Sequence, residues 1–505
     1  MKYTAQQPVR VCLIIPRSPF LLDERVFMHL GILKVAAMLE SKGYKVDMLD
    51  LSGVENDEEV LADYLRMEER ANVFGLTATT PQIPEAVRIS KFLKKNKTNV
   101  EKIILGGPHV TLMHTASKRE TYSGLSDANR ATKDIESLLT YFDVLVCGDG
   151  EFAVFEAFKI KTGIIDADDR KSSLFLTNED FSGLPLPARH LVNVESYHYS
   201  IEGRKAISLI AQLGCPFKCT FCSGRNSPFL RNIRTRDVDS VAKEVEHLHL
   251  EYGMKGFMFY DDELNVNKEM INLMNKIFDI QQKHNTKFFL RGFIKAELFD
   301  EIQAKAMYRA GFRWILVGFE SGDERILKNI RKNATRDDNL RCIKIAKHHN
   351  LKVKALMSIG HAGESIESIN NTTNWLLEAR PDDFDCTIIT TYPGSPYFDE
   401  AAFDPRLNCY VYEDRLTKER LYQASIDYQL DQDYYKGDPD GGYISYVWTD
   451  NISAEDLVHE RNLLEKEVRE KLNIPYYPSR AGMVYEHSMG MGNINLPPSI
   501  FRRGH

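Results

Sequence analysis

Three cysteines within eight residues form the part of this sequence best suited to chemistry. Cys215, Cys219 and Cys222 share one Gly- and Pro-containing loop, whereas the other five of the eight cysteines are scattered along the chain. Closely spaced thiolates bind iron-sulfur clusters or zinc. Structural zinc usually pairs two such knuckles, and no second knuckle follows. We expect the three thiolates to bind three irons of a four-iron cluster and to leave the fourth iron open. A zinc site with a distant fourth ligand, or three coincidental core cysteines, are the alternatives.

The residues around this loop alternate between β-branched runs and amphipathic runs. Strands are predicted at 206–212, 256–260, 287–292, 314–318, 352–359 and 385–391, and helices at 238–252, 270–284, 299–310, 335–349 and 366–379. Six strand-helix units in a row predict a partial (β/α)6 barrel over residues 205–400, with its chemistry at the carboxyl ends of the strands. The cysteine loop follows the first of these strands, so we expect it at the barrel mouth.

An earlier strand-helix series fills residues 1–165. Strands are predicted at 9–15, 44–49, 73–76, 102–105 and 144–146, and helices at 31–43 and 84–95. This spacing predicts a doubly wound, Rossmann-like α/β sheet that binds ligands at its strand ends. Pro16-Arg17-Ser18-Pro19 follows the first strand in place of the dinucleotide fingerprint glycines, which removes an ordinary NAD site. The segment 166–204, with its prolines near 181–188, is interpreted as a linker.

Composition sets broader limits. The chain has 505 residues, a formal net charge of -7 and 43% apolar residues, enough for roughly three domains with cores of their own. We expect a cytoplasmic protein without a membrane span, in a reducing compartment, and nucleic acid is an unlikely partner. Residues 401–505 are expected to be a mainly helical region capping the substrate. Its tyrosines could line a substrate pocket or simply pack, and they are Tyr410, Tyr412, Tyr422, Tyr428, Tyr434, Tyr435, Tyr443 and Tyr446.

The segment Cys215-Pro-Phe-Lys-Cys219-Thr-Phe-Cys222 resembles the signature of the radical S-adenosylmethionine superfamily. This resemblance, over residues 205–400, implies that the open iron chelates S-adenosylmethionine. It also implies that an electron from a flavodoxin- or ferredoxin-type donor cleaves that molecule to a 5'-deoxyadenosyl radical. The residues that it implies for S-adenosylmethionine are Phe221, Asp262, Arg291, Glu320, Ser321 and Gly360. Helix-terminal charges at Asp261 and Asp262 and an ordinary ion pair at Arg291 or Glu320 are the alternatives. For His361 a hydrogen bond within its loop is favoured over catalysis.

The Gly- and Thr-rich strand ends of the first domain resemble the cobalamin-binding domain of the cobalamin-dependent branch of that superfamily. The contacts that this resemblance implies are Thr77, Thr79, Thr80, Gly106, Gly107, Pro108, His109, Gly148, Gly150 and Glu151. The Asp-x-His-x-x-Gly motif that supplies a lower cobalt ligand is absent. His29 and His109 are therefore expected to be rim or structural residues. The alternative is a degenerate domain that no longer binds cobalamin.

Together these resemblances imply an enzyme that uses a [4Fe-4S] cluster, S-adenosylmethionine and cobalamin. The favoured reaction is methylation of an unactivated carbon or phosphorus centre in a small molecule or natural product. A rearrangement, cyclisation or oxidation, with cobalamin as electron carrier or absent, is the alternative. A cobalamin sensor with an inert barrel is a third hypothesis, which the intact cysteine loop disfavours.

Overall fold

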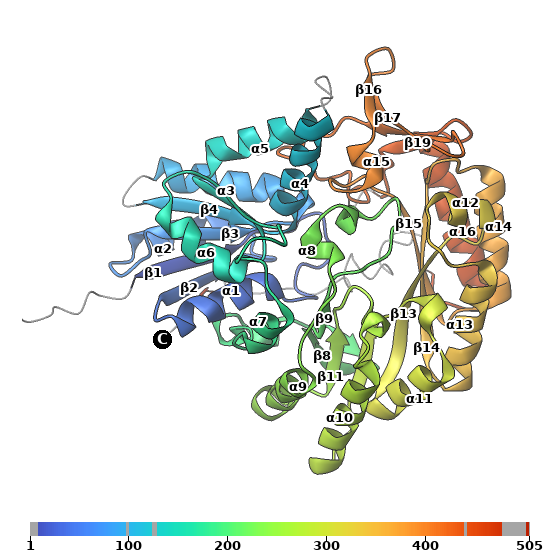
Figure 1. The fold of residues 1–505 in the computed structure, drawn as a ribbon, viewed down its shortest axis with the longest axis horizontal. Helices are drawn as coiled ribbons and strands as arrows, with labels where there is room; N and C mark the ends of the chain where they lie inside the picture. The colour runs from blue at the N-terminus through green and yellow to red at the C-terminus, as the bar shows by residue number, and fades with distance from the viewer. Residues whose placement is uncertain (1–8, 97–99, 124–128, 439–441, 477–500, 504–505) are drawn as a thin grey trace, which may run out of the picture.

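Two parallel sheets lie side by side, and a small antiparallel sheet sits beside both of them (Figure 1). The computed structural model describes residues 9–96, 100–123, 129–438, 442–476 and 501–503. Within that part of the chain, every helix is too short or too polar to cross a membrane.

The first sheet has seven strands in the order β20-β2-β1-β3-β4-β5-β6, and all of them run parallel except β20. The change of direction between β1 and β3 is the switch point at which doubly wound sheets bind ligands. β1 is buried on both faces, as its unbroken apolar run predicts for a central parallel strand. The strands are β1 (Arg10–Ile15), β2 (Lys45–Asp50), β3 (Val73–Thr77), β4 (Lys102–Gly106), β5 (Val144–Gly148), β6 (Gly163–Ala167) and β20 (Phe501–Arg503).

Helices cover both faces of this sheet. One face packs against α1 and α6, and the other against α2, α3, α4 and α5. The predicted doubly wound fold is confirmed, and β6, α2 and α4 to α6 are additions to the predicted elements. The helices are α1 (Leu30–Ser41), α2 (Asp57–Arg66), α3 (Ile83–Lys95), α4 (Pro108–Ser123), α5 (Arg130–Tyr141) and α6 (Gly150–Lys159).

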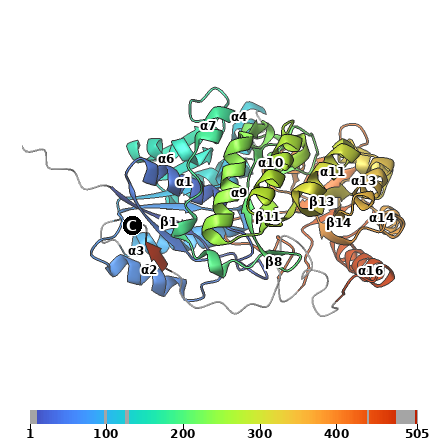
Figure 2. The same cartoon turned by 90° about the horizontal axis from the view of Figure 1, so that it is seen from below.

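The second sheet is the predicted partial barrel, with six parallel strands in sequence order and β7 (Ser200–Ile201) antiparallel at its edge. Apolar side chains on its outer face pack under a layer of helices, which Figure 2 shows from below. Its strands are β8 (Arg204–Leu209), β11 (Gly256–Phe259), β12 (Phe289–Phe293), β13 (Phe312–Glu320), β14 (Lys352–Ile359) and β15 (Asp383–Ile388). Its helices are α9 (Val238–Tyr252), α10 (Met270–Lys283), α11 (Glu301–Ala310), α12 (Glu324–Asn329), α13 (Arg336–His348) and α14 (Ile366–Ala379).

Caps explain where several barrel helices begin and end. Asp237 accepts hydrogen bonds from two backbone N–H groups in the first turn of α9, and Gly253 ends that helix in the left-handed conformation at φ 63°. Ser365 caps α14 in the same manner. The segment between the two domains contains α7 (Asn178–Gly183), and short β9 (Gln212–Leu213) and β10 (Arg234–Thr235) bracket the cysteine loop and α8 (Pro228–Arg231).

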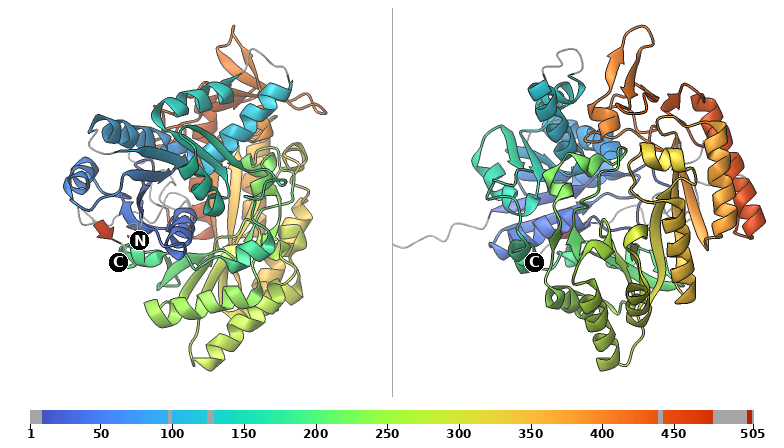
Figure 3. Two further views of the ribbon diagram at one scale, coloured as in Figure 1. Left: turned by 60° about the vertical axis from the view of Figure 1, so that its left-hand side comes forward. Right: turned by 45° about the vertical axis from the view of Figure 1, so that its right-hand side comes forward.

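The C-terminal region differs from the mainly helical one that was expected. Four short strands form an antiparallel sheet, and a single long helix, α16, packs against α14 and β15 (Figure 3). The strands of this sheet have only three to five residues each, which is too short for a clear alternation of apolar and polar residues in the sequence. The elements are α15 (Pro396–Asp399), β16 (Ala402–Asp404), β17 (Cys409–Glu413), β18 (Arg420–Ala424), β19 (Val447–Thr449) and α16 (Ala454–Leu472).

Candidate functional site

The cysteine loop leaves the carboxyl end of β8 and is held by the end of the neighbouring strand. Asp261, just past β11, accepts hydrogen bonds from the backbone N–H groups of Ala211 and Gln212. Asp262 accepts one from Gly214 N at 2.7 Å. Gly214 has φ +87°, and a Cβ there would lie 2.0 Å from the carbonyl oxygen of Asn232. Glycine is therefore required where the loop turns toward Cys215.

The three thiols lie at different depths. Cys219 is buried, Cys215 is half-buried and Cys222 is accessible to solvent although loops surround it. Burial raises the pKa of the Cys215 thiol to about 12, and burial together with Cys219 raises that of Cys222 to about 11. Metal binding requires thiolates, so a bound cluster would have to displace these protons. Three soft donors in one loop, none of them in a disulfide, fit an iron-sulfur cluster.

Glu320 lies at the end of β13, inside a buried chain of hydrogen bonds. Its carboxylate accepts hydrogen bonds from Lys332 Nζ at 3.0 Å and from Ser358 Oγ at 2.9 Å. Burial acts to raise the pKa of Glu320, but Lys332 and Ser358 hold it below its usual value. Ser358 Oγ also lies 2.8 Å from Nε2 of His361, and the Tyr397 hydroxyl lies 3.5 Å from its Nδ1.

His361 completes this chain and contacts a second predicted residue. Its ring centre lies 5.3 Å from that of Phe221, which stands in the cysteine loop. Burial lowers the pKa of His361 to about 4, so the ring is neutral near pH 7. The hydrogen bond expected of His361 is present. The structure thus brings Phe221 and Glu320 to opposite ends of the contacts around His361, which Gly360 directly precedes in the chain.

Three other predicted S-adenosylmethionine residues have contacts outside this chain of hydrogen bonds. Arg291 lies on the inner face of β12, with its guanidinium 5.6 Å from the centre of the Trp314 ring. Ser321 points toward α14, where its hydroxyl lies 3.2 Å from that of Thr372. The carboxylate of Asp262 accepts a hydrogen bond from the backbone N–H of Gly214. Asp262 and Ser321 thus have local hydrogen-bond partners, and the partner of Asp262 is the cysteine loop rather than a helix N-terminus.

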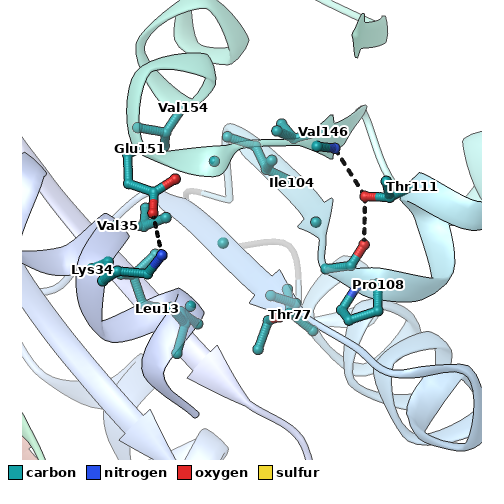
Figure 4. A pocket seen from close by; sticks show the side chains of 18 of the residues that line it. Leu13, Lys34, Val35, Thr77, Ile104, Pro108, Thr111, Val146, Glu151 and Val154 are labelled. Atoms are coloured by element: carbon teal, nitrogen blue, oxygen red, sulfur yellow. Dashed lines mark hydrogen bonds and ion pairs between the residues drawn. The ribbon is translucent and has the colours of Figure 1, made fainter. Parts of the chain in front are cut away.

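A cavity of about 210 Å³ opens on the first domain, between the sheet and helices α1 and α6 (Figure 4). Its floor is formed by β1 and by the carboxyl halves of β3, β4 and β5, and its walls are mostly apolar. Lys34 and Glu151 form an ion pair of 2.8 Å at its edge, and Thr111 donates to the carbonyl oxygen of Gly107. Of the predicted cobalamin contacts, those lining it are Thr77, Gly106, Gly107, Pro108, Gly148, Gly150 and Glu151.

The remaining predicted contacts do not line that cavity. His109 is fully buried, and its Nε2 lies 3.0 Å from Asp134 on α5. Thr79 hydrogen-bonds Gln82, and Thr80 is buried in the following turn. Each of these side chains thus has a structural role. His29 is half-buried, and desolvation lowers its pKa.

The glycines at the strand ends are required by the protein's own backbone. At Gly107, with φ +104°, a Cβ would lie 2.7 Å from backbone atoms of Ala78. At Gly148, with φ +81°, it would lie 2.5 Å from the carbonyl carbon of Ala167. Close backbone approach therefore occurs here within the domain itself, before any ligand is considered. Gly31 differs, because it lines the cavity and a Cβ there meets nothing within 4 Å.

The loop after Cys222 is fastened to the first domain by two buried carboxylates. Asp168 accepts hydrogen bonds from Ser227 Oγ at 2.9 Å and Phe229 N at 2.6 Å. Asp149, the N-cap of α6, forms a buried ion pair with Arg234 at 2.5 Å. The Phe229 side chain also lines the cavity. The two candidate sites are therefore joined through a few ordered contacts.

Comparison with known families agrees with these two sites. The sequence model of the radical SAM superfamily matches residues 209–376, and that of the B12 binding domain matches residues 25–132. This chain is a radical S-adenosylmethionine enzyme with a B12-binding domain. Its cofactors are accordingly a [4Fe-4S] cluster, S-adenosylmethionine and cobalamin.

Three similar proteins match much of the length of this chain. An uncharacterised methyltransferase of Pyrococcus horikoshii is 24% identical over 80% of this chain and 85% of its own. The anaerobic magnesium-protoporphyrin IX monomethyl ester cyclase of Cereibacter sphaeroides is 26% identical over 68% of this chain and 55% of its own. The radical S-adenosylmethionine methyltransferase TsrM of Kitasatospora setae, solved with cobalamin and a [4Fe-4S] cluster, has a TM-score of 0.65. That likeness has 16% identity and covers 90% of this chain and 91% of TsrM, and it shows a shared fold.

Sequence reasoning missed several residues of the site. Lys295, Lys332 and Tyr397 are buried beside the cysteine loop or the Glu320 chain, although each stands in a stretch that reads as an ordinary loop. The position of Lys332, twelve residues after Glu320 and just past a short helix, was a signal that could have been used. Among the C-terminal tyrosines, five are buried, as their packing alternative predicted: Tyr412, Tyr422, Tyr428, Tyr434 and Tyr443.

Proposed function

We propose that this enzyme transfers a methyl group to an unactivated carbon or phosphorus centre of a small molecule or natural product. One observation carries the proposal. The segment that follows the three cysteines contacts Asp149 and Asp168 of the first domain and lines its cavity with Phe229, so the two cofactor sites would lie close together. The names of the Pyrococcus and Kitasatospora relatives support methyl transfer.

The residues would divide the work as follows. Cys215, Cys219 and Cys222 would hold the cluster, and Phe221, Glu320 and Gly360 would border the bound S-adenosylmethionine. The cavity beside Gly31, Gly106 and Thr77 would take part of the cobalamin, because its walls are apolar and its rim offers hydroxyl and amide groups. When bound, the cluster supplies the electron that cleaves S-adenosylmethionine, and cobalamin carries the methyl group.

The other predicted residues would support the two cofactor sites. Arg291 would face substrate from the inner wall of the barrel, and Asp262 would fix the cysteine loop by holding Gly214. Ser321, Thr79, Thr80 and His109 would support the neighbouring loops from behind. Pro108, Gly107, Gly148, Gly150 and Glu151 would shape the rim of the cobalamin cavity.

A basic surface would receive the electron donor. Lys218 is exposed in the cysteine loop, and the guanidinium groups of Arg225 and Arg231 donate to the carbonyl oxygens of Lys218 and Phe217. Burial lowers the pKa of Arg225, and the neighbouring Arg331 adds to this effect. An acidic flavodoxin- or ferredoxin-type donor would dock here, close to the cluster. The free cysteines and the cluster suit a reducing cytoplasm.

The test is a product analysis under anaerobic conditions with S-adenosylmethionine carrying a deuterated methyl group. Methyl transfer predicts a labelled product, with S-adenosylhomocysteine and 5'-deoxyadenosine formed in about equal amounts. Conversion of a substrate with 5'-deoxyadenosine alone, and with no label, would favour the second candidate, a cyclisation or oxidation. The similarity to the Cereibacter cyclase is the observation that keeps this candidate in view.

A further inference from the structure

Two lysines are buried against the cysteine loop. The exposed fractions are 2% for Lys295 and 5% for Lys332. Lys295 Nζ donates to the carbonyl oxygen of Lys332 at 3.0 Å and lies 4.7 Å from the centre of the Phe217 ring, inside the loop. Burying an ammonium group is costly unless it has partners. Both lysines meet this condition, because each has a carboxylate partner.

Their position beside Cys219 is fixed by backbone contacts. Thr220, the next residue after Cys219, donates its N–H to the carbonyl oxygen of Ile330 at 2.9 Å. Ile330 stands two residues before Lys332, so the segment with that lysine is fastened to the loop. Lys295 Nζ in turn donates to the carbonyl oxygen of Lys332, so both lysines are held beside the segment that carries the Cys219 sulfur.

Each of the two lysines is ion-paired with a carboxylate, so removal of either lysine would leave a negative charge without its partner beside the cluster. Glu320 and Glu297 each pair with one lysine, at 3.0 Å from Lys332 and Lys295 respectively. Burial raises the pKa of Glu263 to about 7, so this third carboxyl carries only part of a charge at neutral pH. Despite burial, Glu320 and Cys219 raise the pKa of Lys332, which keeps its ammonium charged.

We propose that Lys295 and Lys332 raise the reduction potential of the cluster bound through Cys219. One-electron reduction adds a negative charge to the cluster, and that electron comes from the acidic flavodoxin- or ferredoxin-type donor. A fixed cation in a poorly screened site stabilises the reduced state more than the oxidised state. The inference rests on the proposed assignment of the cluster to the three cysteines. It assigns these lysines as positioning residues, which act through the cluster without bonding to it.

The experiment is a redox titration of the anaerobically reconstituted full-length protein, without S-adenosylmethionine, followed by electron paramagnetic resonance. In Lys295→Met and Lys332→Met, the ratio of reduced to oxidised cluster at a given potential should fall at least tenfold, which corresponds to about 59 mV. Lys332→Arg should keep the wild-type midpoint. Lys354→Met is the matched control, because Lys354 is equally buried on the same barrel but pairs with Asp383 and Asp385. Its midpoint should not change.

Iron and sulfide contents separate the two ways of failing. A wild-type protein that binds no four-iron cluster would defeat the proposed function itself. Clusters in every variant, with unchanged midpoints in both Lys→Met variants, would overturn the inference alone. Weaker binding of S-adenosylmethionine by Lys332→Met at an unchanged midpoint would overturn it too and would make that lysine a ligand-binding group. If Lys332→Met does not fold, Lys332→Met/Glu320→Gln removes the ion pair as a whole, and Lys295→Met still decides.

Discussion

Removal of the carboxylate charge of Asp149 should loosen the contact between the two cofactor sites. This carboxylate and Arg234 have side-chain exposures of 1% and 4%, and Asp149 also accepts a hydrogen bond from Leu176 N at 2.9 Å. Asp149→Asn keeps the shape and an acceptor for Leu176 but leaves the Arg234 charge without its partner. Breaking a buried pair in this way costs about 3–5 kcal/mol.

Arg234→Met separates the contribution of the ion pair from that of the packing around the Arg234 side chain. The guanidinium lies 4.6 Å from the ring of Phe175 and 5.0 Å from that of Phe229, so methionine keeps apolar contact with both. The double variant should lose less stability than the sum of the two single variants. The coupling should fall at about 1–3 kcal/mol, as for residues in direct contact.

The assay is urea unfolding of the full-length variants, together with limited proteolysis of the segment 166–204. Glu156→Gln is the control, because Glu156 forms an exposed ion pair with Lys159 on the same helix, α6. This control should change stability by no more than about 0.5 kcal/mol. If Asp149→Asn costs no more than Glu156→Gln, or if the cycle is additive, the contact does not join the two sites in the way described.

Three further perturbations test separate parts of the account. Gly31→Phe should fill the cavity of the B12-binding domain and abolish the corrin absorbance while leaving the iron content unchanged, whereas Gly183→Phe, at an exposed helix glycine with free space, should retain both. Cys219→Ala should lose the cluster absorbance and 5'-deoxyadenosine formation, whereas Cys342→Ala, at a buried cysteine of α13, should retain both. Burial lowers the pKa of His361 from 6.5 to about 4, so the unfolded chain binds a proton that the folded chain refuses, and stability falls as the pH drops from 6.5 to 4. His361→Gln should flatten that part of the stability profile by up to about 3 kcal/mol, and an unchanged profile would contradict the assignment.

Local sequence pattern was enough to predict the cysteine loop, both parallel sheets and the strand ends that carry the site. These features depend on periodicity and on turn residues that lie next to one another in the chain. His109 shows where such reasoning ends. It directly follows Pro108, which lines the cavity, but successive residues of a helix point in different directions, and His109 faces Asp134 on α5 instead.

Long-range contacts explain most of what was missed. Lys295 and Lys332 stand in connecting segments, where lysine is usually solvated, and only the folded barrel buries them beside Cys219. Asp149 and Asp168 find their partners in a loop more than fifty residues further along the chain. The strands of the C-terminal sheet are short and are stabilised by pairing with one another, so the sequence of each strand alone does not predict it.

The most direct test of methyl transfer needs no substrate. The full-length enzyme, loaded with its cluster and cobalamin, would be reduced and incubated with S-adenosylmethionine that carries a deuterated methyl group. The corrin would then be extracted in the dark and analysed by mass spectrometry. The account predicts about one labelled methyl group on the corrin for each enzyme molecule, with S-adenosylhomocysteine in equal amount, and the Gly31→Phe variant should give neither. A corrin without label, beside continuing formation of 5'-deoxyadenosine, would contradict methyl transfer.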